Sequence, residues 1–121
     1  MKFFFINGIL LITFLFSPSA KAAQSEQTIE HGKYVALLGD CIGCHTLLGE
    51  GAYFAPELGN VYKRRGPEFI KAWIKSQPTG TPGRRQMPQF NLTDSELDDL
   101  VAFLKYASEI NTNKWPPNIE G

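Results

Sequence analysis

The sequence contains few residues that can bind a metal ion or form a disulfide, because its 121 residues include only two cysteines, two histidines and two methionines. A structural zinc site usually needs four cysteine or histidine ligands, and His31 is distant from the only group that contains the two cysteines and His45, so such a site is disfavoured. The sequence also has no excess of positive or negative charge, since its 12 basic and 12 acidic residues cancel. Without a basic stripe, we expect no nucleic acid as a partner.

The sequence also lacks an apolar run long enough to cross a membrane by itself. The stretch Phe3–Phe16 is apolar but shorter than the roughly 20 residues that a spanning helix needs. Lys2 precedes it, and Ala20-Lys21-Ala22 follows it with the small-x-small pattern of a signal peptidase site. We therefore expect residues 1–22 to be a signal peptide cleaved after Ala22, with an uncleaved anchor as the alternative. Residues 23–121 would then form one exported, periplasmic domain.

Three helices are expected in this domain. The last has the clearest signal, because Thr93 and Glu96 form a capping box and apolar residues recur at helical spacing after them. A middle helix is indicated by Pro67 at its first position, after Gly66. An earlier one is expected to end at Gly39. The expected bounds are Thr28 or Ile29 to Leu38, Pro67 to Lys75, and Thr93 to about Ser108.

No segment alternates between apolar and polar residues as a strand does, so we predict an all-α domain. Two long loops, Thr46–Gly66 and Pro78–Asn91, separate the helices, and loops of this length are unusual unless they wrap something. A bulky cofactor in the core would account for both. The middle helix has one apolar face, formed by Phe69, Ile70, Trp73 and Ile74.

The segment Cys41-Ile42-Gly43-Cys44-His45 matches the C-x-x-C-H pattern for covalent attachment of haem c. The two thiols, one turn apart, add across the two vinyl groups of the porphyrin, and His45 is carried to the iron as an axial ligand. A thioredoxin-type redox pair would sit in a βαβ context, which the sequence lacks. A disulfide between the two cysteines would leave a small domain with long loops and no core. We therefore expect one covalent haem c.

Met87 is the only methionine left once the signal peptide is removed, and it lies between Gln86 and Pro88, just before the last helix. A thioether in such a loop can reach the haem iron as the second axial ligand. The alternative is a methionine that fills an irregular gap in the core. His31 is a rival ligand, but its place on the first helix favours the surface. Ligation by His45 and Met87 would fill both axial positions, as in an electron carrier with no catalytic residue.

Three stretches between Cys41 and Gly121 resemble the cytochrome c subunit of bacterial nitric oxide reductase: CIGCHTLLGEGAYFAPELGNVYKRRG, PTGTPGRRQMPQFNLTDSELDDL and NKWPPNIEG. The resemblance implies a class I cytochrome c fold, with three main helices and long loops wrapped around one covalently bound haem. In the wider cytochrome c pattern the first and last helices cross where a glycine meets an aromatic residue. Gly32 against Leu100 and Phe103 resembles that contact.

The same resemblance implies roles for single residues. His45 and Met87 would be the axial ligands, and the carbonyl of Pro56 would bond to the other ring nitrogen of His45. The family also places a calcium ion near the subunit interface, for which Gly51 and Tyr53 are the corresponding positions. Four basic residues are candidates for contacts with haem propionates or with the partner subunit, the alternative being solvated basic turns: Arg64, Arg65, Arg84 and Arg85.

The resemblance implies an electron-transfer role. In such reductases the small subunit receives electrons from a periplasmic donor and passes them to haem b in a large membrane subunit, which holds the catalytic centre. The family's small subunit usually has a longer N-terminal segment with a membrane-spanning helix, whereas this sequence begins like a signal peptide. The alternative is therefore a freestanding soluble periplasmic carrier that serves another oxidoreductase. An enzyme or gas sensor would instead need an open position on the iron.

Overall fold

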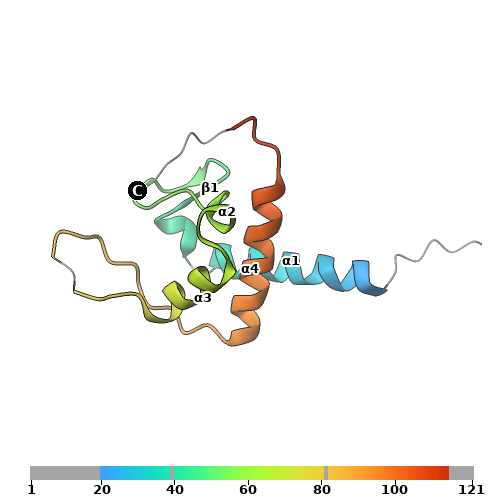
Figure 1. Cartoon of the computed structure of the whole chain (residues 1–121), viewed down its shortest axis with the longest axis horizontal. Helices are drawn as coiled ribbons and strands as arrows, with labels where there is room; N and C mark the ends of the chain where they lie inside the picture. The colour runs from blue at the N-terminus through green and yellow to red at the C-terminus, as the bar shows by residue number, and fades with distance from the viewer. Residues whose placement is uncertain (1–19, 39, 81, 115–121) are drawn as a thin grey trace, which may run out of the picture.

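Two helices from opposite ends of the described chain cross near the middle of the structure (Figure 1). The computed structural model describes residues 20–38, 40–80 and 82–114. Among these residues no helix combines the length and the apolar character needed to span a membrane. In chain order the elements are α1 (Ala20–Leu38), the 3-10 turn η1 (Cys41–Gly43), β1 (Thr46–Leu47), β2 (Glu50–Gly51), α2 (Val61–Arg65), α3 (Pro67–Ser76) and α4 (Asp94–Glu109).

Helix α1 begins earlier than predicted. We expected it to begin at Thr28 or Ile29, whereas it begins at Ala20. The added turns consist mainly of alanine, glutamine, glutamate and lysine, which favour helix, and no glycine or proline interrupts them before Gly32. The expected start was wrong because it relied on apolar spacing, which begins only at Ile29. The expected cleavage point after Ala22 falls within this helix, and residues 1–19 lie outside the described part of the chain.

The crossing of α1 and α4 depends on Gly32. A Cβ atom built on Gly32 would overlap the backbone carbonyl of Asp99 and would lie 2.8 Å from the Cβ of Phe103, so only glycine allows this approach. The predicted contact of Gly32 with Phe103 is thereby confirmed, and Leu100 is buried in the same core. Beside the crossing, His31 Nδ1 lies 2.6 Å from Asp99 Oδ2. His31 is exposed, as expected of a surface residue.

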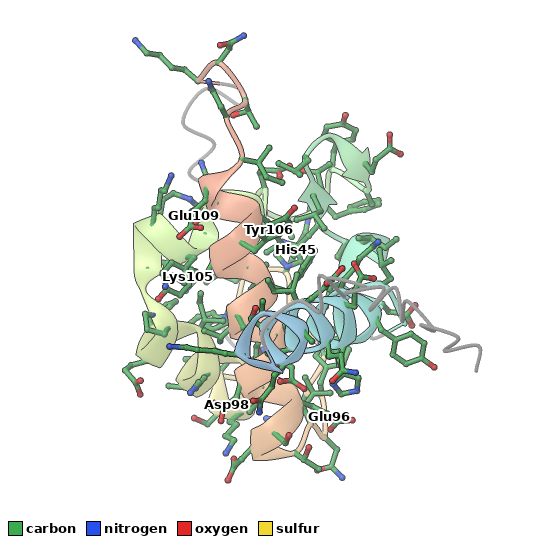
Figure 2. All side chains as sticks on the ribbon, turned by 90° about the vertical axis from the view of Figure 1, so that its right-hand side faces the viewer. His45, Glu96, Asp98, Lys105, Tyr106 and Glu109 are labelled. Carbon is green, nitrogen blue, oxygen red and sulfur yellow. The ribbon has the colours of Figure 1, made fainter. Side chains whose placement is uncertain are left out.

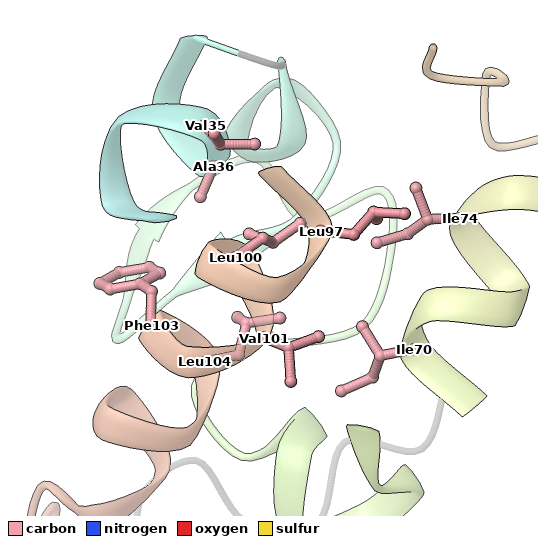
Figure 3. Packing of buried hydrophobic residues seen from close by; sticks show 9 residues of the cluster. All are labelled: Val35, Ala36, Ile70, Ile74, Leu97, Leu100, Val101, Phe103 and Leu104. Carbon is pink, nitrogen blue, oxygen red and sulfur yellow. The ribbon is translucent and has the colours of Figure 1, made fainter. Parts of the chain in front are cut away.

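The buried core lies between α1, α3 and α4, and α4 contributes most of it (Figure 3). Helix α3 buries Ile70 and Ile74 but not the whole of its predicted apolar face. Phe69 is 42% exposed and stacks on Trp73, with the ring centroids 5.5 Å apart. Helix α4 therefore covers only part of the apolar face of α3. The core residues are Val35, Ala36, Ile70, Ile74, Leu97, Leu100, Val101, Phe103 and Leu104.

The first turn of α4 has the predicted capping box. The backbone N–H of Glu96 donates to Thr93 Oγ1 at 3.2 Å, and the backbone N–H of Thr93 donates to Glu96 Oε2 at 2.8 Å. Hydrogen bonding to Thr93 holds the pKa of the Glu96 carboxyl below its usual range. The predicted start of this helix is confirmed, and its end at Glu109 lies one residue beyond the expected Ser108.

Ion pairs connect α3 to the same end of α4. Lys71 pairs with Asp98, and Lys75 pairs with Asp94. The hydrogen bond from Lys75 lowers the pKa of Asp94, and the bond to Asp98 raises the pKa of Lys71. Because these side chains reach solvent, the pairs contribute little to the stability of the fold. Figure 2 shows Asp98 near this end of α4, well away from Glu109 at the other end.

The segment 46–66, predicted to be a loop, contains regular structure. Strands β1 and β2 pair antiparallel, with Thr46 opposite Gly51 and Leu47 opposite Glu50, and α2 follows them. Strands of two residues have no alternation to detect, and a helix of five residues is little more than one turn. The middle and last helices lie where they were predicted. Gly39 and the tail from residue 115, both of which figured in the sequence analysis, lie outside the described residues.

Candidate functional site

The C-x-x-C-H segment forms a tight turn directly after α1. Residues Cys41–Gly43 form η1, and the backbone N–H of His45 donates to the Cys41 carbonyl at 2.8 Å. Asp40, whose φ of 60° is in the left-handed region, directs the chain into η1. Both thiols are free, that of Cys44 on an exposed residue and that of Cys41 on a half-buried one. Burial raises the pKa of the Cys41 thiol, so this group is uncharged at neutral pH.

His45 is held by the segment that follows the hairpin of β1 and β2. Its Nδ1 lies 2.6 Å from the carbonyl oxygen of Pro56. A carbonyl can only accept a hydrogen bond, so Nδ1 carries the hydrogen and Nε2 keeps a lone pair for a metal. The N–H groups of Phe54 and Ala55 donate to the Cys44 carbonyl at 3.0 and 2.9 Å and fasten this segment to the turn. The imidazole therefore has a fixed tautomer and orientation, and Figure 2 shows it set back among the surrounding elements.

The hairpin packs on the cysteine turn at Gly51. This residue has a φ of 112°, and a Cβ atom on it would overlap the His45 carbonyl and lie 3.0 Å from the carbonyl oxygen of Ile42. Packing alone thus requires glycine here, apart from the role at a calcium ion that the resemblance implied. Next along the chain, Tyr53 and Phe54 are 77% and 64% exposed. Two large aromatic side chains therefore stand at the surface beside the turn.

Glu57 is a residue of the site that sequence reasoning missed. Its side chain is 1% exposed, and its Oε1 accepts hydrogen bonds from the N–H groups of Leu48 at 2.6 Å and Gly59 at 2.9 Å. Its Oε2 is buried and has no hydrogen-bond partner among the described residues. Because Glu57 directly follows Pro56, these bonds hold the backbone next to the carbonyl that orients His45. A glutamate in a loop rich in glycine and proline carries no sequence signal for this buried role.

Met87 lies in the segment that links α3 to α4. It is half-buried and packs against the core. The same segment reaches the other side of the site through Arg85, whose Nη1 donates to the Phe54 carbonyl at 2.6 Å. The Arg85 guanidinium also lies 5.2 Å from the centroid of the Phe54 ring, a cation–π distance. The two segments that we expected to wrap a cofactor are thus in contact at Arg85 and Phe54.

The four arginines singled out from the sequence have different surroundings. Arg64 is half-buried, and it donates from Nε to Asn60 Oδ1 and from Nη2 to the Glu57 carbonyl, both at 2.8 Å. It therefore braces the loop around Glu57, a role that the sequence did not indicate. The other three are exposed: Arg65, Arg84 and Arg85.

The donor atoms of the site fit a covalently attached haem. Within the described ranges, no three histidine, cysteine or acidic side chains gather closely enough to hold a metal ion. The site offers two free thiols at C-x-x-C spacing, an imidazole with Nε2 available and, in the α3–α4 segment, a half-buried thioether. These are the groups that haem c with histidine and methionine ligands requires.

Comparison with known proteins identifies the family of this chain. The Cytochrome c family matches residues 29–108, a range that includes the cysteine turn and Met87. The C subunit of the nitric oxide reductase of Stutzerimonas stutzeri is 54% identical over 111 residues, which cover 88% of this chain and 76% of the relative. Its counterpart in Paracoccus denitrificans is 47% identical over an alignment of 130 positions, which covers 98% of this chain and 87% of the relative. The counterpart in Cereibacter sphaeroides is 51% identical over 98 residues, 74% of this chain and 67% of the relative.

The family match confirms the predicted class I cytochrome c fold, to which the described residues add the small sheet and α2. A cytochrome c of this kind implies a covalent haem c, and Cys41 and Cys44 have the spacing for it. The relatives also agree with the resemblance that the sequence analysis identified from its three stretches. The chain belongs to the cytochrome c family, in the branch formed by the C subunits of nitric oxide reductases.

Proposed function

We propose that this chain transfers electrons through one covalent haem c and acts as the small subunit of a nitric oxide reductase. The hydrogen bond between His45 Nδ1 and the Pro56 carbonyl carries the proposal. It leaves Nε2 as the ring nitrogen available to iron and makes the imidazole a stronger donor. The names of the relatives support the assignment to a nitric oxide reductase complex.

Four residues would hold the haem. Cys41 and Cys44 would attach it through thioether bonds, and His45 and Met87 would be the axial ligands of the iron. When bound, the haem supplies a one-electron redox couple. The chain itself fixes the imidazole, keeps the Cys41 thiol uncharged, leaves Cys44 exposed for attachment, and packs the methionine against the core. With both axial positions filled by the protein, this subunit would be non-catalytic, and the reduction of nitric oxide would take place in the large subunit.

The surface beside the cysteine turn supports a partner on this side of the molecule. Tyr53 and Phe54 are largely exposed there, and aromatic residues are enriched at protein interfaces. We propose that they face the membrane-bound, haem b-containing large subunit. Gly51 and Tyr53 are also our candidates for a calcium ion at that interface. The exposed arginines of the site remain candidates for contacts with the haem propionates or with the partner.

We place the domain in the periplasm, where a periplasmic electron donor would meet it. Residues 1–22 would be removed as a signal peptide after Ala22. The similarity to the Paracoccus denitrificans relative covers 98% of this chain and so extends into these residues, which keeps the uncleaved anchor as the alternative. In either case the redox domain would lie on the periplasmic side of the membrane.

Purification of a tagged chain from a denitrifying host tests the proposal. We expect it to bring down a haem b protein with several membrane spans, and we expect the intact mass of residues 23–121 plus one haem. A matched chain with Tyr53→Ser and Phe54→Ser should keep its haem but recover less of the large protein. If the unaltered chain never brings down such a protein, the role as a subunit is wrong and a freestanding carrier takes its place. A mass without haem would refute the electron-transfer role itself.

A further inference from the structure

The segment 78–91 must hold Met87 in place with little regular structure of its own. Apart from Thr81, whose placement is not described, the segment contains no helix and no strand. Three proline residues limit the backbone hydrogen bonds that it can form. The position of Met87 therefore depends on side chains that reach into the segment from outside or close it on itself.

One buried side chain holds the backbone of Met87 directly. Gln77 follows the last residue of α3 and is 4% exposed. Its Nε2 donates to the carbonyl oxygen of Met87 at 2.6 Å and to that of Pro88 at 2.9 Å. Both acceptors are carbonyls, so the amide must present its nitrogen to them. One carboxamide thus fixes the two peptide groups that follow the methionine.

The other contacts of the segment are exposed and act on its neighbours. Gln86 closes the base of the segment, because its Nε2 donates to the Pro78 carbonyl at 2.7 Å and its Oε1 accepts from the Gly80 N–H at 2.7 Å. Arg85 reaches out to the Phe54 carbonyl. Water can replace these exposed bonds at little cost, whereas the bonds from the buried Gln77 amide are part-buried and are less easily replaced. Among these contacts, the Gln77 bonds are the most costly to lose.

We infer that Gln77 is the positioning residue for Met87, acting through the Met87 and Pro88 carbonyls to hold the thioether where the haem iron requires it. The inference rests on the proposed role of Met87 as axial ligand. The second polar atom of the amide agrees with a donor role, because Gln77 Oε1 is buried and has no partner in the described part of the chain. The amide is thus held for its two N–H groups and not for its acceptor.

Two substitutions remove these donors in different ways. Gln77→Leu keeps an apolar stem of similar size and leaves both carbonyls without a donor. Gln77→Glu keeps the shape but places an acceptor against two acceptors, which is repulsive when the carboxyl is ionised. Gln27→Glu makes the same chemical change on an exposed position of α1 and serves as the matched control. Helix α3 ends at Ser76, so neither substitution at Gln77 changes its helical residues.

The experiment uses the full chain with haem attached and titrates the oxidised protein with imidazole, which competes with the methionine for the iron. The absorption band of methionine-ligated ferric haem and the reduction potential are recorded beside it. We expect both Gln77 variants to bind imidazole about tenfold more tightly, from the loss of the two part-buried hydrogen bonds that Gln77 donates. Their methionine band should weaken, and their potential should fall. Gln27→Glu should stay within about twofold of the unaltered chain.

Three outcomes separate this inference from the proposed function. The positioning role would be overturned, with Met87 still the ligand, if both Gln77 variants kept the imidazole affinity, the methionine band and the reduction potential of the unaltered chain. A Met87→Leu chain with the band and the imidazole affinity of the unaltered protein would refute Met87 as ligand and the proposal beneath it. Far-UV circular dichroism accompanies each variant. A loss of helix in both Gln77 variants would show that Gln77 supports the fold in general, which also overturns the inference.

Discussion

Replacing Gly32 by alanine should push α1 away from α4. In most helices this change is favourable, because alanine is preferred over glycine by about 1 kcal/mol. Here the new methyl group would overlap the Asp99 carbonyl and lie 2.8 Å from the Cβ of Phe103. Overpacking costs about 1–3 kcal/mol, and backbone atoms cannot escape it by changing rotamer, so we take about 3 kcal/mol. The net loss is about 2 kcal/mol, which lowers the Tm by about 8–16 °C for a domain of this size.

Thermal unfolding of the haem-loaded chain, followed by circular dichroism, measures this loss. Gly43→Ala is the matched control: it is the same chemical change within the cysteine turn, and its Cβ would meet only the Asp40 Cβ at 4.0 Å, an ordinary contact. The control should leave the Tm nearly unchanged. A Gly32→Ala chain as stable as the control would show that the two helices can separate freely, and the reasoning about the crossing would be wrong.

Two further predictions concern carboxylates that bind backbone N–H groups. Glu57→Ala removes the acceptor of the buried Gly59 N–H group and of the part-buried Leu48 N–H group. A buried donor left unsatisfied costs about 1–3 kcal/mol, so urea unfolding should show a loss of about 2 kcal/mol. A loss below about 0.5 kcal/mol would contradict a bracing role. The lowered pKa of Glu96 stabilises the fold above its unfolded-state pKa of about 4.3, and this contribution is lost as the pH falls through the lower folded-state value. Glu96→Gln should therefore make the Tm fall less steeply from about pH 5 to pH 3, and curves parallel to the unaltered chain would count against the Thr93 bond as the cause.

The sequence predicts best those parts of the structure that rest on local rules. The start of α4 follows from Thr93 and Glu96, whose side chains satisfy backbone donors within one turn. The cysteine turn follows from the spacing of its residues, and the first position of α3 follows from Pro67. The Pro56 bond to His45 was implied by the resemblance and is present at 2.6 Å. In each case the relevant partners are close in the chain or belong to a family pattern.

Other features depend on contacts between distant residues and could not be predicted. The burial of Glu57 depends on how the hairpin and α2 enclose it, and nothing in its neighbours along the chain indicates this. Gln77 follows the end of α3, where a polar residue ordinarily faces solvent, yet it binds carbonyls ten and eleven residues later. Tertiary contacts decide the positions of Glu57 and Gln77, and a single sequence does not reveal them. The early start of α1 is different, because it follows from local helix propensity in a stretch that has no apolar stripe.

The segments that carry His45 and Met87 are held by different kinds of bonds, and this difference has a consequence for local unfolding. His45 lies among backbone hydrogen bonds of the turn and the hairpin, whereas the Met87 segment is fastened by a few side chains. Segments with sparse backbone bonding open at a small fraction of the global unfolding free energy. The methionine side should therefore detach and return many times during the life of one folded molecule, while the histidine side stays closed. Under heat or denaturant such a protein loses the absorption band of methionine-ligated haem first and its helices later. The first transition then measures the stability of the Met87 segment, and the second measures the stability of the whole domain.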